Sequence, residues 1–262
     1  MHIHLRHIFA VVLFIFLPAC CMDTQIDIQN QLVQAVQKGD IPSVQHWIAQ
    51  GADIHAGSYI GDPLIHRAAL AGHTHMVRFL QSRGLTLQGY DACGLTIVHK
   101  AAVVDNTELL DYLIHENQLN KNVITWDDQY LCTPLHLAIF NNKKRAVQYL
   151  VCAGASIDAV CQHNTTPLHL AASLGLTDII DYLIQSGADV EKINAYGRTV
   201  LDLAAIHNRP KVIKLLVEKY CFDPAACDCR AYKLAQEYDA QEAIAEFEYQ
   251  IQRIINNLSN IQ

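Results

Sequence analysis

Residues 133–138 read Thr-Pro-Leu-His-Leu-Ala, and the same six residues recur unchanged at 166–171, 33 positions further along the chain. Looser copies lie at 64–68, 96–101 and 199–204. The His position of the motif, taken by Asp in the last copy, falls at residues 66, 99, 136, 169 and 202, so the spacings are 33, 37, 33 and 33. A fixed period of this length predicts a repeat architecture, in which each unit buries its apolar face against its neighbours.

A glycine-containing triplet keeps the same phase as this motif. It reads Gly51-Ala52-Asp53, Gly154-Ala155-Ser156 and Gly187-Ala188-Asp189. Between the two markers, apolar residues recur at i, i+3 and i+4, which is typical of an amphipathic helix. A Thr opens most copies of the motif, where its hydroxyl can cap free backbone N–H groups of a helix; these residues are Thr96, Thr133, Thr166 and Thr199.

The two markers and the paired helices resemble the ankyrin repeat. The resemblance covers residues 25–226 and implies an all-α solenoid of stacked helix-turn-helix units with β-hairpin fingers. We expect six repeats, at 25–57, 58–90, 91–127, 128–160, 161–193 and 194–226, followed by a degenerate seventh repeat and a helical cap at 227–262. In this family the repeated His is a structural hydrogen-bond partner, which implies a structural role for His66, His99, His136 and His169, and for Asp202 in the sixth repeat.

Composition restricts the classes of function. The chain has 262 residues, of which 51% are hydrophobic and 17% charged, with a net charge of −7. Such a chain is too apolar to be disordered, and too acidic and charge-poor to favour nucleic-acid binding. It contains none of the common nucleophile, phosphate-loop or dinucleotide motifs, so we expect neither an enzyme nor a cofactor.

Nine Cys and fourteen His residues leave a metal-linked or redox-linked role open as an alternative. Their spacing matches no standard zinc motif, so no metal ligands are assigned. Near the C-terminus, a disulfide between Cys221 and either Cys227 or Cys229 is an open alternative to free thiols buried in helical packing.

The first nineteen residues are predicted to be a signal peptide. The apolar run at 8–17 is too short to span a bilayer but fits the hydrophobic region of a signal peptide. Residues 17–20, Leu-Pro-Ala-Cys, resemble the bacterial lipobox, which implies cleavage before Cys20, lipidation of its thiol and a short tether at 20–24. The expected location is then the periplasm or outer membrane. A plainly secreted protein, an uncleaved membrane anchor and an effector delivered into a host cell stay open.

Ankyrin proteins usually bind partners on a concave face made of finger tips and the exposed side of the first helices. The third finger is four residues longer than the others and contains Trp126, which we add to the positions that the family implies. The candidate partner-binding residues are then Tyr59, Ile60, Asp62, Cys93, Leu95, Trp126, Tyr130, Cys132, Phe140, His163, Thr165, Ser173, Tyr196, Arg198 and His207. Aromatic residues are frequent among them and charges are few, which suits a protein or peptide partner. The predicted function is a non-enzymatic protein–protein interaction scaffold.

Overall fold

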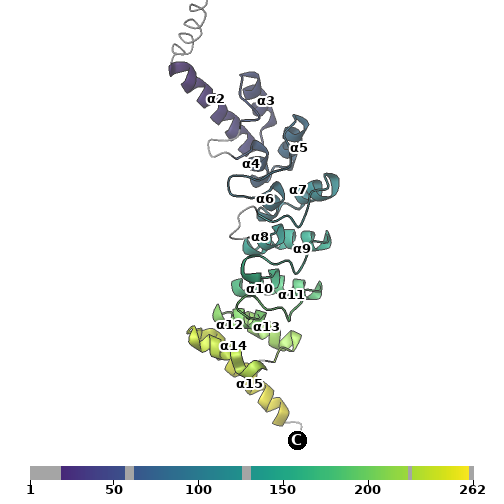
Figure 1. Cartoon of the computed structure of the whole chain (residues 1–262), viewed down its shortest axis with the longest axis vertical. Coiled ribbons are helices and arrows are strands. Elements are labelled where there is room, and N and C mark those ends of the chain that lie inside the picture. Colours follow the sequence, from purple (N-terminus) through teal and green to yellow (C-terminus); the bar gives the residue numbers. More distant parts are fainter. Residues whose placement is uncertain (1–18, 57–61, 126–130, 224–225, 260–262) are drawn as a thin grey trace, which may run out of the picture. The chain divides into compact units, whose positions relative to one another are not determined.

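The structure, a computed structural model, describes residues 19–56, 62–125, 131–223 and 226–259 (Figure 1). All regular structure in these ranges is helical, which confirms the predicted all-helical fold. The chain divides into two compact units, Met1–Ala92 and Cys93–Gln262. None of the described helices is long and apolar enough to cross a membrane. The predicted signal peptide and four candidate partner residues, Tyr59, Ile60, Trp126 and Tyr130, lie wholly or almost wholly outside the described residues.

The first unit contains four helices: α2 (Ala19–Lys38), α3 (Ile41–Ala49), α4 (Leu64–Leu70) and α5 (Thr74–Ser82). Helix α2 packs on both α3 and α4, and α4 packs on α5. Residues 20–24, expected as a tether, belong to helix α2, which begins at Ala19. Helix α3 starts where the Asp40 carboxylate accepts a hydrogen bond from the backbone N–H of Ser43 at 3.2 Å, with Pro42 in the first turn.

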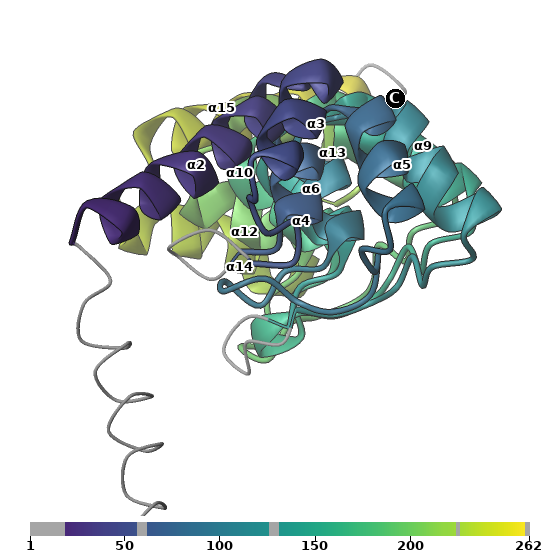
Figure 2. The ribbon, with the colours of Figure 1, turned by 90° about the horizontal axis from the view of Figure 1, so that it is seen from above.

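The second unit stacks pairs of helices in two rows (Figure 1). The first helices of the pairs are α6 (Ile97–Val103), α8 (Pro134–Phe140), α10 (Pro167–Leu174) and α12 (Val200–Ile206). The second helices are α7 (Thr107–Asp111), α9 (Lys144–Cys152), α11 (Thr177–Gln185) and α13 (Pro210–Tyr220). In Figure 2, which looks along the stack, the loops between pairs extend together on one side of the helices.

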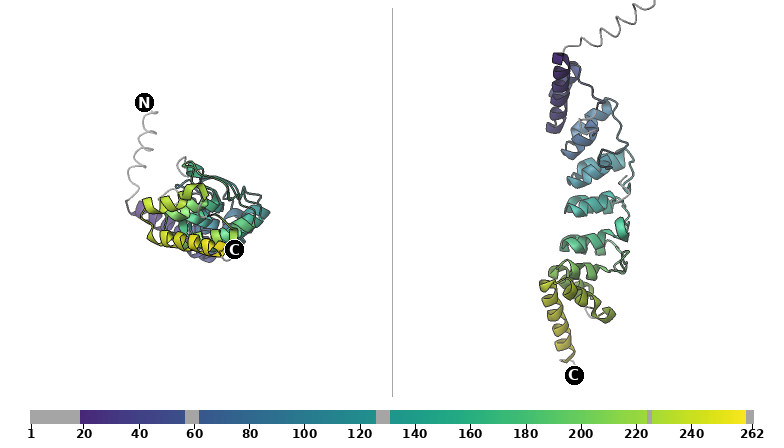
Figure 3. Two further views of the ribbon diagram at one scale, coloured as in Figure 1. Left: turned by 90° about the horizontal axis from the view of Figure 1, so that it is seen from below. Right: turned by 60° about the vertical axis from the view of Figure 1, so that its left-hand side comes forward.

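Two longer helices follow the last pair, α14 (Ala226–Glu237) and α15 (Gln241–Ser259). Helix α14 packs on α12, and α15 packs on α13, so this pair continues the two rows (Figure 3). Phe247 in α15 is fully buried, and its ring meets the Tyr232 ring edge-on with 6.2 Å between centroids. The aromatic contact and the buried alanines of α14 and α15 join the two helices in the region expected as the C-terminal cap.

The α6–α7 pair of the third repeat differs from its neighbours because its second helix changes from α-helical to π-helical geometry. Helix α7 is followed by a π-helical turn at Tyr112–Glu116, and the N–H of Asn117 bonds to the carbonyl of Tyr112 at 3.1 Å. Asn117 stands where other repeats have Gly, and the positive φ of 56° is taken by Gln118 instead. A π-turn adds a residue to a helix without breaking it, so the turn absorbs part of the longer sequence spacing in this repeat.

The finger loops carry much less strand than the resemblance implied. In the described loops the only bridge pairs Cys161 with Thr165. Side chains add to the few backbone bonds of these loops. Asn194 Oδ1 accepts hydrogen bonds from the N–H groups of Tyr196 and Arg198, both at 3.0 Å, beside the backbone bond from the Asn194 N–H to the Arg198 carbonyl at 3.0 Å. An Asx side chain that satisfies backbone donors in this way supplements the cross-strand bonds of a hairpin.

Candidate functional site

A cavity of about 510 Å³ lies on the finger loops of the second unit, and we call it the finger pocket. Its walls come from three successive loops and from helices α8 and α10. The lining residues are Cys93, Leu95, Thr125, Cys132, His136, Leu137, Phe140, Cys161, Gln162, His163, Thr165 and Leu170. Six of them, Cys93, Leu95, Cys132, Phe140, His163 and Thr165, are predicted partner-binding residues, although they are spread over 73 positions of sequence.

Buried hydrogen bonds fix the loop that carries Cys132. Its N–H donates to Thr125 Oγ1 at 3.1 Å, and its carbonyl accepts from the Thr125 N–H at 3.0 Å and from His99 Nε2 at 3.0 Å. Thr125 is 4% exposed, so these bonds are shielded from water. The Cys132 side chain is therefore presented to the pocket by a backbone held on both sides.

Helix α8 supplies the base and one wall of the pocket. It begins at a capping box in which Thr133 Oγ1 accepts from the His136 N–H and His136 Nδ1 accepts from the Thr133 N–H. Because Nδ1 accepts from a backbone N–H, the proton of the neutral ring lies on Nε2, which points to the Thr165 carbonyl at 3.2 Å. One helical turn after His136, Phe140 is 63% exposed. The helix thus fixes an imidazole at the base and an exposed ring at the rim.

Cys161 is the residue whose chemistry is most altered by the pocket. Its N–H donates to the Thr165 carbonyl at 3.0 Å, which ties the loop closed beside His136. Hydrogen bonds from the Cys132 thiol and the His136 imidazole, acting against partial burial, lower the pKa of the Cys161 thiol from 9.0 to about 5. The Cys161 sulfur therefore ionises more readily than an ordinary cysteine, in a partly exposed cavity.

An aromatic strip extends from the rim of the pocket toward α14. The rings of His163 and Tyr196 lie 5.1 Å apart, and the Arg198 guanidinium lies over Tyr196 at 5.5 Å. Arg198 also donates to the hydroxyl of Tyr238 at 2.8 Å. Tyr196 is 62% exposed. The tilted ring contact and the cation–π contacts keep these side chains extended on the surface, where they add an aromatic area to the pocket.

The other predicted partner residues lie elsewhere. Ser173 bonds to the carbonyl of Leu170 in its own helix at 2.8 Å, and His207 is exposed at the end of α12. Asp62 belongs to the first unit, where its carboxylate accepts from the N–H of Ala92 at 3.2 Å and lines a separate cavity. The structure therefore brings together six of the predicted residues and joins two more, Tyr196 and Arg198, to their rim.

Sequence reasoning missed several residues that line the pocket. Leu137 and Leu170 are the fifth residue of each Thr-Pro-Leu-His copy, which the helical pattern assigns to the core, yet both are only half-buried. Cys161 stands five residues before Thr166, where the third and sixth repeats have Asp91 and Asn194. The presence of a Cys at a position where other repeats have Asp or Asn could have identified Cys161 as unusual from the sequence.

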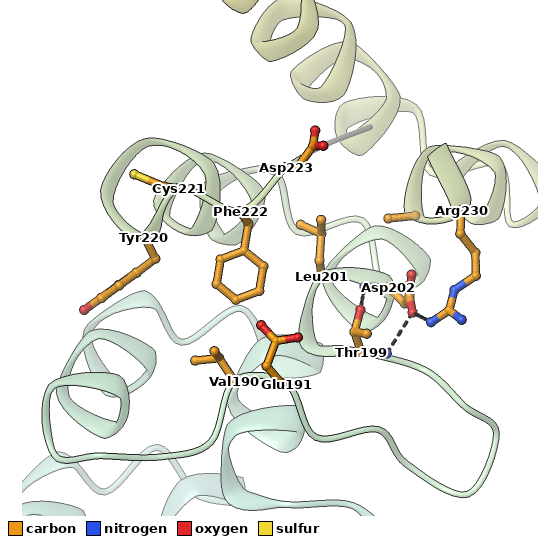
Figure 4. Close-up of a pocket in the computed structure, with 11 residues that line it drawn as sticks. Val190, Glu191, Thr199, Leu201, Asp202, Tyr220, Cys221, Phe222, Asp223 and Arg230 are labelled. Atoms are coloured by element: carbon orange, nitrogen blue, oxygen red, sulfur yellow. Dashed lines mark hydrogen bonds and ion pairs between the residues drawn. The ribbon is translucent and has the colours of Figure 1, made fainter. Parts of the chain in front are cut away.

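A second cavity, of about 320 Å³, separates the sixth repeat from α14 and is lined largely by structural groups (Figure 4). Asp202 is held there by an ion pair with Arg230, which also donates to the Gly197 carbonyl at 2.8 Å. Phe222 points toward Val190 and Glu191. Cys221 is free and exposed, not buried in helical packing as one alternative expected. The side chains of Cys227 and Cys229 lie outside the described set, so a disulfide with either of them stays an open alternative. In the described parts of the chain, no three His, Cys, Asp or Glu side chains are grouped to hold a metal ion.

A family model described as "Ankyrin repeats (3 copies)" matches residues 32–125, 83–161 and 135–228. The chain belongs to the ankyrin-repeat family. A chain in the structure of the Bd0816 predatory endopeptidase from Bdellovibrio bacteriovorus in complex with immunity protein Bd3460 is 28% identical, with a TM-score of 0.62 over 72% of this ankyrin chain and 97% of that one. The ankyrin repeat domain of Bcl-3, a member of the IκB family, has the same TM-score at 23% identity, over 80% of this chain and 97% of its own.

One curated relative is 31% identical over 133 residues, the E3 ubiquitin-protein ligase XBAT32 of Arabidopsis thaliana. That match covers 50% of this chain but only 24% of the ligase. The likeness therefore concerns an ankyrin segment shared with a much longer protein.

Proposed function

We propose that this chain is a non-enzymatic scaffold that binds a protein or peptide partner through the finger pocket and the aromatic strip beside it. The observation that carries the proposal is the convergence of six predicted partner positions on one cavity. Ankyrin repeats typically serve protein–protein interaction, and a 28% identical neighbour was solved within a protein complex.

The chemistry of the surface favours an apolar or aromatic anchor from the partner. Leu95, Leu137, Phe140 and Leu170 supply the apolar walls, and the pocket's volume suits a few side chains of an extended segment. Backbone atoms of Cys132, Cys161 and Thr165 are tied down by hydrogen bonds before any partner arrives. A preformed site of this kind loses little conformational entropy on binding.

The test is capture of partners by crosslinking, with the purified full chain as bait and matched variants. Phe140→Ala removes an exposed ring at the pocket rim. Tyr249→Ala removes a ring of similar exposure on α15, since the two side chains are 63% and 59% exposed. We expect a protein captured by the unaltered chain and by Tyr249→Ala to be reduced about tenfold or more with Phe140→Ala, the loss of an interface hot spot of at least 1.4 kcal/mol. Equal capture by both variants, each folded by circular dichroism, would contradict the proposal.

The proposal extends to the location of the protein: export and tethering through a lipid on Cys20. It is supported by the apolar run at 8–17 and the lipobox-like residues 17–20. The intact mass of protein purified from its native membrane distinguishes the alternatives. A mass that starts at acylated Cys20 supports the tether, a start at a later unmodified residue supports plain secretion, and an intact Met1 supports an uncleaved anchor or a host-directed effector.

A further inference from the structure

Two thiols and an imidazole line the finger pocket together: Cys132, Cys161 and His136. The Cys132 and His136 side chains both interact with the Cys161 sulfur, which also lies 3.9 Å from the Gln162 carbonyl. Both cysteines are half-buried rather than enclosed, and both line the same cavity of about 510 Å³. A small solute can therefore reach either sulfur.

The backbone around Cys161 shares one hydrogen bond with the equivalent loop of the next repeat. In the next repeat, Asn194 makes the same backbone bond, from its N–H to the carbonyl four residues on, and the two distances are both 3.0 Å. The Asn194 side-chain oxygen there accepts two further N–H groups at 3.0 Å. At Cys161 the equivalent Thr165 N–H bonds to the Gln162 carbonyl instead, at 3.2 Å, so the groups that act on the sulfur come from Cys132 and His136. With Cys161, the group that receives hydrogen bonds is a sulfur, and donors stabilise its anionic form.

The two loops hold the two cysteines by separate anchors. The Thr165 carbonyl accepts from both the Cys161 N–H and His136 Nε2, at 3.0 and 3.2 Å. The Cys132 carbonyl accepts from His99 Nε2 at 3.0 Å. Buried imidazoles, 0% exposed in both cases, therefore fix the backbone on which each thiol is carried. The sulfurs meet because adjacent repeats place their loops side by side.

We propose that Cys161 and Cys132 form a peroxide-reactive dithiol site, in which Cys161 reacts first and Cys132 closes a reversible disulfide. The Cys161 sulfur attacks one oxygen of a hydroperoxide; an S–O bond forms, the O–O bond breaks, and the other oxygen leaves and takes a proton as water or an alcohol. The Cys132 sulfur then attacks the sulfenic sulfur; the S–S bond forms, the S–O bond breaks, and the hydroxyl leaves as water with the Cys132 proton. The two sulfurs together lose two electrons, which the peroxide gains. Two equivalents of an external thiol, which are oxidised to a disulfide, restore both cysteines.

The reaction at this site needs no bound partner, because it uses only the two loops and a small oxidant. A disulfide across the finger pocket would link the fourth and fifth repeats where Leu95, Leu137 and Phe140 form the walls. Closure of the pair would therefore reshape the pocket that the proposed function uses.

The experiment treats the reduced, purified full chain with a few equivalents of hydrogen peroxide, blocks the remaining thiols by alkylation and maps the peptides without reduction. We expect a peptide pair joined through Cys132 and Cys161, which disappears on treatment with dithiothreitol. Cys132→Ser should stop at a sulfenic acid on Cys161 that a 1,3-dione reagent traps. Cys152→Ser, a change at an exposed cysteine outside the pocket, should leave the linked peptide unaltered.

A second measurement needs no variant. At pH 6.5, iodoacetamide should alkylate Cys161 at least tenfold faster than Cys152 in the unaltered chain, because the thiolate is the reactive form. Alkylation of the two at equal rates, a disulfide from Cys161 to any other cysteine, or peroxide treatment that leaves Cys161 reduced would each overturn the proposal.

Discussion

His136 Nε2 lies 3.2 Å from the carbonyl oxygen of Thr165, so the His of one repeat donates to the finger loop of the next. The same bond joins His99 to Cys132 at 3.0 Å and His169 to Arg198 at 3.2 Å. Each of these rings also accepts from the Thr at the start of its own helix. One imidazole therefore caps a helix and links two repeats at once.

Replacing His136 with Ala should destabilise the protein by about 1–3 kcal/mol, because the Thr165 carbonyl and the Thr133 N–H both lose a buried partner. The measurement is the urea midpoint of unfolding, followed by circular dichroism at 222 nm. His207→Ala, at an exposed position, is the matched control and should change the midpoint very little. Equal midpoints for the two variants would mean that the bonds between repeats contribute no net stability.

The sequence predicted the repeat period, the helices and the Thr and His markers because these depend on contacts that recur in every unit. Gly154 and Gly187, for instance, take φ values of 78° and 93° at the end of their helices, as expected where only Gly adopts such values cheaply. The π-turn at Tyr112–Glu116 could not be read, because the pattern of i, i+3 and i+4 apolar residues continues through it.

The candidate site was predictable only in part, for a different reason. Cys93 and His163 hold one equivalent loop position, and Leu95, Cys132 and Thr165 hold another, and the family comparison can supply both. The acidity of Cys161 arises from Cys132 and His136, which lie 29 and 25 residues away in sequence and meet it only in the folded protein. No local sequence motif predicts the contact of Cys161 with Cys132 and His136.

Stability should fall as the pH is lowered from 7.5 to 5.5, and His169 should cause part of the loss. Burial lowers the pKa of this imidazole below 6.5, against hydrogen bonds to carbonyls that raise it. Because the unfolded chain binds the proton more readily, the contribution of His169 is complete above pH 6.5 and decreases as the pH falls toward the folded-state pKa. The urea midpoint of His169→Gln should therefore depend less on pH than that of the unaltered chain. A variant with the full pH dependence would assign the loss to other groups, and His163→Gln serves as the exposed control.

Gly175→Ala should cost more stability than Gly187→Ala, although both residues have a positive φ, of 81° and 93°. A Cβ at position 187 meets nothing within 4 Å, so its cost is the backbone strain alone, about 1 kcal/mol. At position 175 a Cβ would lie 3.0 Å from Arg209 Cδ, and Arg209 Nε donates to the Ser173 carbonyl at 2.9 Å. Displacing that side chain adds the loss of a hydrogen bond, about 1 kcal/mol. Melting followed by circular dichroism should show the larger decrease for Gly175→Ala; the reverse order would exclude Arg209 as the cause.

Asp202 takes the place of the repeated His, and its replacement by Ala should destabilise the C-terminal end most strongly. Its carboxylate accepts from the Thr199 N–H at 2.7 Å, closes the capping box of α12 and pairs with Arg230 of α14. The Asp202 side chain is 3% exposed, whereas Asp178, which pairs with Lys144 at 2.8 Å, is 74% exposed. Loss of a cap and of a buried acceptor predicts about 2 kcal/mol for Asp202→Ala, and an exposed pair predicts under about 1 kcal/mol for Asp178→Ala. Hydrogen exchange followed by mass spectrometry locates the effect: protection should decrease in α12 and α14 and stay unchanged in α8. Uniform loss of protection across the second unit would show that the Asp202–Arg230 contact stabilises the whole stack rather than its C-terminal pair.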